Sequence, residues 1–343
     1  MVTFRNNRTL KRAILATALA VLAPWSARAV YYAPGYDLQV VSSAQGLVNG
    51  AVNYQTNGLW GTSAVSTPLT THFTLSACDT VAFSRLYLDL WGGTSAKTCT
   101  VTATLNGTAL AAVTCSGIAD TNPGFDASKT CVYGTGSGMW QVAYAGIASL
   151  LKTDGTANTL SFSLSSTNGF DGRTASASLV TVYTDTDLKQ TLDYYLAEGD
   201  GTLRKTPGTN GSPATRSLAF NGLDTINIGN ATYYAGYTHG TTGEKDQVYF
   251  NGTTLGGSDN DVALGTTSDY GPSNHAFDVT SLLTTTSTAY YSVTAADVGV
   301  SGEGYLRANI GLLEITHPIP EPAALALLLA GAVTLLRRRP GKI

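Results

Sequence analysis

The chain repeats one order of segments along its length, and this repeat limits the possible folds more than any single motif does. In each copy, a segment with alternating side chains leads into an Asn-Gly-Thr turn, and a later segment ends in Ser-Leu-Leu. The turns lie at 106–108 and 251–253, and the Ser-Leu-Leu triplets lie at 149–151 and 281–283. Two copies of one sequence pattern predict two copies of one structural unit.

The segments between the turns have the pattern of β-strands. Residues 85–91 alternate, so that Leu86, Leu88 and Leu90 fall on one face and other side chains on the opposite face. Short strands separated by Gly-, Asn- and Ser-containing turns are typical of antiparallel β-sandwiches. The body between the terminal segments lacks sustained helical periodicity, and only 144–151 and 279–283 favour a helical turn.

The N-terminus has the composition of a secretory signal peptide. Basic residues occur up to Arg12, and a short apolar core follows at 13–22. The segment then ends in Ala27-Arg28-Ala29, which has the A-x-A pattern of a cleavage site and places the mature N-terminus at Val30. An apolar core of this length is too short for a retained membrane anchor.

The C-terminus contains a second targeting pattern. It consists of a Pro-Glu-Pro motif, an apolar run at 323–336 and a basic cluster, in the order Pro320, Glu321, Pro322, then Arg337, Arg338 and Arg339. As a helix, the apolar run would span about 21 Å, which is less than the ~30 Å hydrocarbon core of a bilayer. A plain C-terminal membrane anchor is the alternative interpretation.

In order and spacing, this tail resembles the PEP-CTERM sorting signal of Gram-negative bacteria. The resemblance implies recognition near Pro-Glu-Pro by an exosortase, a membrane cysteine transpeptidase, and an association with exopolysaccharide and biofilm production. It also implies export by the secretion machinery to an inner-membrane intermediate, followed by placement at the cell surface or in the extracellular matrix. The membrane would then be contacted only through the tail before processing.

Together, these features predict an all-β fold of two tandem antiparallel β-sandwich, jelly-roll-like repeats. A signal helix is expected at the N-terminus and a hydrophobic helix at the C-terminus. The predicted parts are a signal peptide at 1–29, a first repeat with a cysteine-containing insert at 30–185, a linker or connecting strand at 186–215, a second repeat at 216–317 and the sorting tail at 318–343.

The charge of the body excludes one class of partner. The whole chain has 20 basic and 23 acidic side chains, but the two terminal signals carry nine of the basic ones and one acidic one. The mature body therefore has a net charge of about −11. An acidic body lacks the basic patch that nucleic-acid binding requires.

The body also resembles a family of secreted domains of unknown function found in archaea and some bacteria, with paired β-sandwich repeats. The resemblance covers roughly residues 80–316 and rests on short motifs, two of which are altered here: Val182-Tyr183-Thr184-Asp185, Ala197-Glu198-Gly199-Asp200 and Phe250-Asn251-Gly252. It implies a fold and brings no activity with it.

The four cysteines lie in the first half of the chain, and an even number in an exported protein predicts two disulfides. If the loop at 106–108 has three residues, Leu105 lies opposite Ala109 and Cys99 lies opposite Cys115. This arrangement favours the pairs Cys99–Cys115 and Cys78–Cys131, among three possible pairings. A zinc site is disfavoured because no C-x₂₋₄-C spacing occurs.

We find no catalytic motif, and the chain is not expected to be an enzyme. The four histidines are far apart in sequence, and neither G-x-S-x-G nor H-E-x-x-H is present. If the chain acts on glycans, Glu198 and Asp200 are the first candidates for paired carboxylates. The adjacent glycines instead favour an interpretation of both residues as turn residues.

Two kinds of ligand site are weaker hypotheses. Calcium is the expected metal if one binds, because hard oxygen ligands in Gly-rich loops suit it, and the candidates are Asp259 with Asp261, and Asp185 with Asp187. Solvated polar loops are the plainer interpretation of these residues. For carbohydrate binding, Trp60 is the best candidate, because it lies in a Gly-rich segment that reads as a loop.

The sequence therefore favours a non-enzymatic exported protein that acts as a matrix, exopolysaccharide-associated or adhesion component. A carbohydrate-binding module is the first alternative, and a secreted glycan-active enzyme is the second.

Overall fold

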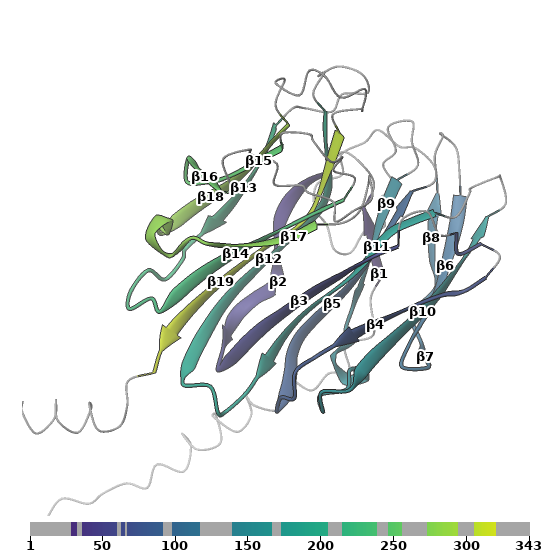
Figure 1. Cartoon of the computed structure of the whole chain (residues 1–343), viewed down its shortest axis with the longest axis horizontal. Helices are drawn as coiled ribbons and strands as arrows, with labels where there is room; N and C mark the ends of the chain where they lie inside the picture. The colour runs from purple at the N-terminus through teal and green to yellow at the C-terminus, as the bar shows by residue number, and fades with distance from the viewer. Residues whose placement is uncertain are drawn as a thin grey trace, which may run out of the picture.

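The computed structural model describes residues 29–32, 36–59, 63–65, 67–91, 98–116, 139–166, 173–204, 215–238, 246–255, 273–293 and 305–319. These residues form antiparallel β-structure in four sheets (Figure 1), which confirms the predicted all-β, β-sandwich fold class. No helix in this part of the chain is long and apolar enough to span a membrane. The two predicted terminal helices lie outside the described residues.

The first sandwich consists of two sheets, named A and C. Sheet A has the strand order β1-β9-β5-β11-β3, and sheet C has the order β4-β10-β6-β7 with β8 also paired to β6. The bounds are β1 (Ala29–Tyr32), β3 (Gly50–Gly58), β4 (Leu69–Thr74), β5 (Thr80–Trp91), β6 (Thr98–Leu105), β7 (Thr108–Ala109), β8 (Val113–Ser116), β9 (Met139–Ala145), β10 (Ala157–Ser166) and β11 (Arg173–Thr184).

The second sandwich consists of sheets B and D. Sheet B has the order β17-β14-β19-β12-β2, and sheet D has the order β13-β18-β15-β16. The bounds are β2 (Tyr36–Val48), β12 (Gln190–Arg204), β13 (Thr215–Asn221), β14 (Asn230–Thr238), β15 (Asp246–Phe250), β16 (Thr253–Leu255), β17 (Ser273–Asp278), β18 (Thr286–Val293) and β19 (Tyr305–Pro318).

The two sandwiches have one topology. The order β9-β5-β11-β3 in sheet A corresponds to β17-β14-β19-β12 in sheet B, and β4-β10-β6-β7 in sheet C corresponds to β13-β18-β15-β16 in sheet D. The strand β12 is therefore the first strand of the second copy, whereas the sequence division treated 186–215 as a linker or connecting strand. The sequence division also placed β2 in the first repeat, at 30–185. In the structure, β2 pairs with β12 and belongs to sheet B of the second sandwich.

The repeated sequence motifs mark one repeated contact. The Asn-Gly turns have positive φ at both residues, with Asn106 at 51° and Gly107 at 80°, and Asn251 and Gly252 at 48° and 80°. Such angles suit a two-residue hairpin turn. In the first copy, the Asn106 amide donates to the Leu150 carbonyl at 2.8 Å. The corresponding Asn251 amide donates to the Leu282 carbonyl at 2.7 Å.

Each Ser-Leu-Leu segment forms the 3-10 turn to which the asparagine binds. The turns are η1 (Ala148–Leu150) and η2 (Thr280–Leu282), which confirms the helical turns predicted at these places. The motif therefore recurs because a turn asparagine in each copy fixes the adjacent 3-10 turn against the hairpin.

Sheet A is buried on both faces, because one face packs on sheet C and the other packs on sheet B. Leu86, Leu88 and Leu90 belong to the core with sheet C, and the alternation predicted only that the three share one face. The opposite residues of β5 are also buried, and Leu196, Ile310 and Leu312 of sheet B join the same cluster.

The contact between the sandwiches has approximate two-fold character. Tyr54 of β3 lies against Tyr234 of β14, with ring centroids 6.3 Å apart. In the reciprocal contact, Glu198 of β12 binds Arg85 of β5. Because β3 corresponds to β12 and β5 corresponds to β14, each copy presents the same pair of strands to the other, as in an isologous dimer interface.

Candidate functional site

Most of the buried charge of the described residues lies between sheets A and B. The alternation of β5 turns Arg85, Tyr87 and Asp89 toward sheet B, and all three are nearly inaccessible to solvent. Arg85 binds both oxygens of Glu198, with Nη2 2.7 Å from Oε2 and Nε against Oε1. The Tyr87 hydroxyl donates to Oε1 of the same carboxylate at 2.8 Å.

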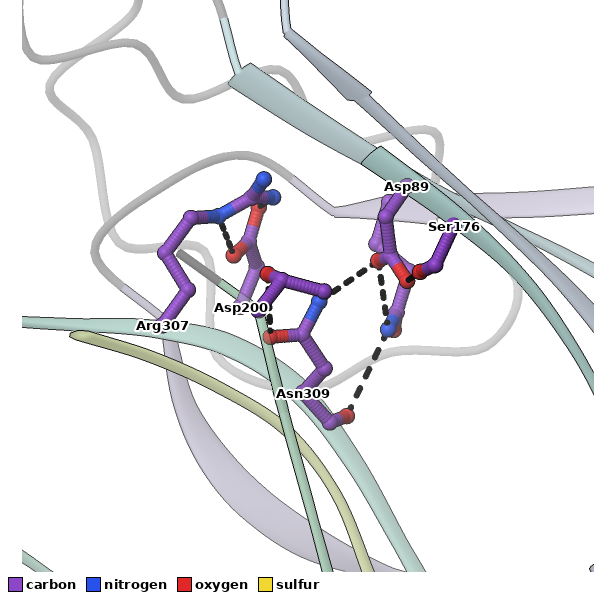
Figure 2. Close-up of polar contacts among 7 residues, drawn as sticks. Asp89, Ser176, Asp200, Arg307 and Asn309 are labelled. Carbon is purple, nitrogen blue, oxygen red and sulfur yellow. Dashed lines mark hydrogen bonds and ion pairs between the residues drawn. The ribbon is translucent and has the colours of Figure 1, made fainter. Parts of the chain in front are cut away.

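A second group of polar residues surrounds Asp89 (Figure 2). Its carboxylate accepts hydrogen bonds from Ser176 Oγ at 2.5 Å, from Asn309 Nδ2 at 2.5 Å and from Gln141 Nε2 at 3.1 Å. The side-chain oxygen Oδ1 of Asn309 in turn accepts from Thr238 Oγ1 at 3.1 Å. Three strands of sheet A and two of sheet B are thus joined through one carboxylate.

The position of Asn309 depends on a β-bulge. Gly236 and Tyr237 of β14 are consecutive, but they pair with Ile310 and Ala308 of β19, so β19 has one extra residue at Asn309. A bulge re-aims the extra side chain, and here Asn309 points toward Asp89 of the other sandwich (Figure 2).

Asp200 and Arg307 form the third polar group, within sheet B. Arg307 Nε donates to Asp200 Oδ1 at 2.7 Å, Nη2 contacts Oδ2, and both side chains have no exposed surface. Burial raises the pKa of Asp200 to about 6, although the Arg307 charge lowers it. Burial also raises the pKa of Asp89, opposed by Arg307 and by its three hydrogen-bond donors.

This arrangement joins the two sandwiches through buried polar contacts and leaves little opportunity for chemistry on a soluble substrate. Glu198 and Asp200 have no exposed surface, and each carboxylate is held by an arginine. The interpretation of both as turn residues is wrong, because they lie within β12. The nearby glycine serves close packing instead, since a Cβ at Gly199 would lie 2.9 Å from the Asp37 carbonyl oxygen of β2.

The predicted cysteine pair lies in register. Cys99 and Cys115 are opposite each other on β6 and β8, both are buried, and both are free thiols in the structure, as is Cys78. The hairpin that gives this register differs from the predicted one, which had a three-residue loop. Leu105 pairs with Thr108, so the loop has two residues, and an irregular stretch before β8 restores the offset. Cys131 lies outside the described residues.

Of the predicted calcium ligands, only Asp185 and Asp187 lie in the described residues. Asp185 Oδ1 accepts the Asp187 backbone amide at 2.9 Å, which is an Asx turn. Asp259, Asp261 and Trp60 lie outside the described residues, as do Ala27 and the sorting residues Pro320, Glu321, Pro322, Arg337, Arg338 and Arg339. Ala29 begins β1.

A different set of residues could hold a metal. Across the described ranges, the one group of three metal-ligating side chains with mutually close ligand atoms is Asp193, Asp224 and His317, whose atoms lie within 4.8 Å of one another. The sequence reasoning missed this group, because three residues so far apart in the chain have no motif spacing.

In the described strands of sheet C, the outer face carries hydroxyl groups and His72, and no Asp, Glu, Lys or Arg. The alternation of β6 and β10 buries Val101, Phe162 and their neighbours, and turns threonine and serine side chains outward. Neighbouring strands are linked by Thr102–Ser163 at 2.8 Å, Thr100–Thr114 at 3.1 Å and Thr70–Ser161 at 3.3 Å. The strands β4, β6, β8 and β10 contain no Asp, Glu, Lys or Arg.

Comparison with known proteins gives a family and several distant structural likenesses. The family model described as "Protein of unknown function (DUF3344)" matches residues 31–316. No curated protein matches the chain.

The solved structures with similarity are remote. BuGH86 in complex with neoagarooctaose has a TM-score of 0.26 and 12% identity, over 80% of this chain and 35% of that chain. PNGase F, a glycosylasparaginase from Flavobacterium meningosepticum, has a TM-score of 0.27 and 12% identity, over 79% of this chain and 97% of that chain. The ANXUR2 extracellular domain from Arabidopsis thaliana has a TM-score of 0.23 and 8% identity, over 86% of this chain and 100% of that chain. Likenesses at these TM-scores indicate neither activity nor ligand.

Proposed function

The chain belongs to the DUF3344 family of proteins of unknown function, and from this premise we propose that it is an exported, non-enzymatic protein of the cell envelope or extracellular matrix. An exosortase would process its C-terminal tail, and its partner outside the cell would be exopolysaccharide. The membrane would be contacted only through the tail before processing.

The observation that carries the proposal is the extent of the folded body. The first strand, β1, begins at Ala29, and residues Val30, Tyr31 and Tyr32 pair with β9. The last strand, β19, ends at Pro318. Apart from Ala29, which precedes the expected signal cleavage site, the described strands lie between that site and the Pro-Glu-Pro motif. Cleavage at both places would therefore remove one residue of β1 and none of the other described strands.

The alternative of a glycan-active enzyme has less support from the residues that suggested it. Glycoside hydrolysis needs two carboxyl groups that flank the substrate. Both carboxylates are buried: Glu198 is bound to Arg85 across the contact between the sandwiches, and Asp200 is bound to Arg307 within sheet B, so a sugar would reach neither without displacing these arginines.

The test of sorting is intact mass spectrometry of envelope and medium fractions from the native host, with and without its exosortase. We expect a mature species that starts at Val30, ends near Pro-Glu-Pro and is absent when the exosortase is absent. A species that keeps Arg337–Arg339 in both strains would overturn the proposal, since the tail would then be an ordinary membrane anchor.

The hydroxyl face of sheet C favours contact with a polysaccharide. Serine and threonine hydroxyls both donate and accept hydrogen bonds, as sugar hydroxyls do. The mature body has a net charge of about −11, which would repel an acidic polymer. The described strands of sheet C carry no Asp or Glu, so a neutral or acidic polymer can approach this face with the least repulsion.

This contact is tested by binding of the native exopolysaccharide to wild type and two charge variants. Thr102→Glu introduces a carboxylate at the centre of the hydroxyl face, and we expect it to weaken binding. Ser217→Glu introduces the same charge at an exposed position of sheet D and is expected to leave binding unchanged. Equal binding by all three proteins would remove the hydroxyl face from the proposal.

A further inference from the structure

One corner of the second sandwich gathers three metal-ligating side chains from separate parts of the chain. Asp193 lies in β12, His317 lies near the end of β19, and Asp224 lies in the turn after β13. In the β12–β19 register, Thr191 pairs with His317 and Asp193 pairs with Ile315. Asp193 and His317 are therefore diagonal neighbours on one face of sheet B.

A backbone contact fixes the histidine in the orientation of a ligand. His317 Nδ1 lies 3.0 Å from the Ile226 carbonyl oxygen. A carbonyl can only accept, so Nδ1 carries the hydrogen and Nε2 presents its lone pair in the neutral ring. A histidine whose other nitrogen donates to a backbone carbonyl is the usual arrangement at metal sites.

The remaining nitrogen faces carboxylates and no donor. His317 Nε2 is buried and has no hydrogen-bond partner. It lies 3.4 Å from Asp193 Oδ2, which is longer than the ~2.7–2.9 Å of a charge-assisted N–H···O bond. A lone pair that faces two carboxylates is electrostatically unfavourable unless the ring is protonated and pairs with Asp193, or a metal ion lies among the three groups.

The separation of the ligand atoms suits a tetrahedral ion. Zinc binds histidine nitrogen and carboxylate oxygen at about 2.0–2.2 Å, and two ligands of a tetrahedron with such bonds are about 3.4 Å apart. The measured distance from His317 Nε2 to Asp193 Oδ2 is 3.4 Å. The third ligand atom, on Asp224, lies within 4.8 Å of the other two and belongs to an exposed residue that can move inward.

We propose that Asp193, Asp224 and His317 form a binding site for a divalent transition-metal ion of the zinc class. One nitrogen and two oxygen ligands suit zinc or cobalt, whereas calcium takes six to eight oxygen ligands. Three protein ligands leave a fourth position on the exposed side of Asp224, where water or a ligand group can bind. The ion would also tie the turn after β13 to the ends of β12 and β19.

The first sandwich supplies an internal comparison. The Gly229 amide donates to the Thr316 carbonyl and the Asp79 amide donates to the Thr184 carbonyl, so Thr316 and Thr184 are equivalent. By the strand registers, Asp185 then stands where the second copy has His317, and Ala51 stands where it has Asp193. The equivalent corner therefore lacks the histidine and one carboxylate.

The proposal is tested by titration of the purified, chelator-treated full-length chain with Co²⁺ and then with Zn²⁺. We expect one Co²⁺ per chain with the visible absorption of a tetrahedral site, and displacement by Zn²⁺. Asp224→Asn keeps the acceptor for the Ile226 amide, so it should fold, and it should weaken binding by about tenfold or more. His317→Gln, with folding checked by circular dichroism, should do the same.

The matched control is Asp187→Asn, which changes an exposed carboxylate near the equivalent corner of the first sandwich and should leave Co²⁺ affinity unchanged. Absence of saturable Co²⁺ and Zn²⁺ binding would overturn the proposal. It would also fail if Asp224→Asn and His317→Gln bound as tightly as wild type, or if Ca²⁺ alone saturated the site.

Discussion

Replacing Arg85 by methionine is expected to destabilise the whole folded body, because it leaves a buried carboxylate without its cation. Arg85 contributes two hydrogen bonds to Glu198, and the side chains are 6% and 0% exposed. After Arg85→Met, the Tyr87 hydroxyl would still donate to Glu198, but the negative charge would remain in the interior. Removal of one partner of a buried ion pair costs about 3–5 kcal/mol.

The double variant separates the cost of a stranded charge from the value of the pair itself. Arg85→Met with Glu198→Leu replaces both partners by apolar side chains of similar volume, a change that is often neutral or stabilising. We expect it to recover most of the lost free energy of unfolding. The coupling free energy between the two sites would then be about 3 kcal/mol or more in a double-mutant cycle.

The assay is urea denaturation of the purified chain, followed by far-ultraviolet circular dichroism. The control is Asp37→Asn, which breaks the ion pair of Arg216 with a carboxylate that is 55% exposed, and such pairs contribute about 0–1 kcal/mol. The reasoning would be refuted if Arg85→Met cost no more than Asp37→Asn, or if the double variant were as unstable as the single one.

Three further outcomes follow from the contacts. Gly236→Ala should cost about 1–3 kcal/mol, because its Cβ would lie 2.2 Å from the Tyr54 hydroxyl, and adding Tyr54→Phe should recover part of that loss in a thermal melt. Burial raises the pKa of Asp200 in the folded protein to about 6, from its ordinary value of 3.8. Asp200 therefore contributes to the free energy of unfolding below pH 4, and this contribution is lost as pH rises through 6. Asp200→Asn should reduce the fall in the free energy of unfolding between urea titrations at pH 4.5 and 7.5. Cys99 and Cys115 of exported protein should resist alkylation without reductant and lose two hydrogens in intact mass, whereas full labelling of both would contradict the disulfide.

Several features of the fold could be read from local pattern. The alternation at 85–91 predicted that Leu86, Leu88 and Leu90 share one face of β5, and the repeated Asn-Gly and Ser-Leu-Leu motifs predicted two copies of one unit. These features depend on the backbone and on near neighbours, since strand side chains alternate and Asn-Gly tolerates positive φ. The motifs even correspond to a direct hydrogen bond, from Asn106 to Leu150 and from Asn251 to Leu282.

Predictions from the local sequence pattern were wrong or missing where contacts with other strands decide the structure. Glu198 and Asp200, next to glycines, had the composition of a turn, but both lie in a central strand because arginines from other strands neutralise them. Likewise, β2 has no sequence feature that assigns it to the second sandwich. The offset of the cysteine hairpin was predicted, although the two-residue loop and the irregularity after it were not.

The sequence by itself determined the class of fold and the number of copies, because each of these depends on composition or spacing along a short stretch. It also supplies the two terminal patterns from which the sorting proposal is drawn. Only the tertiary structure decided what the charged residues do. The buried ion pairs and the corner of Asp193, Asp224 and His317 join residues that are far apart in the chain. Their proximity results from sheet order, strand register and one bulge, and no local spacing encodes these.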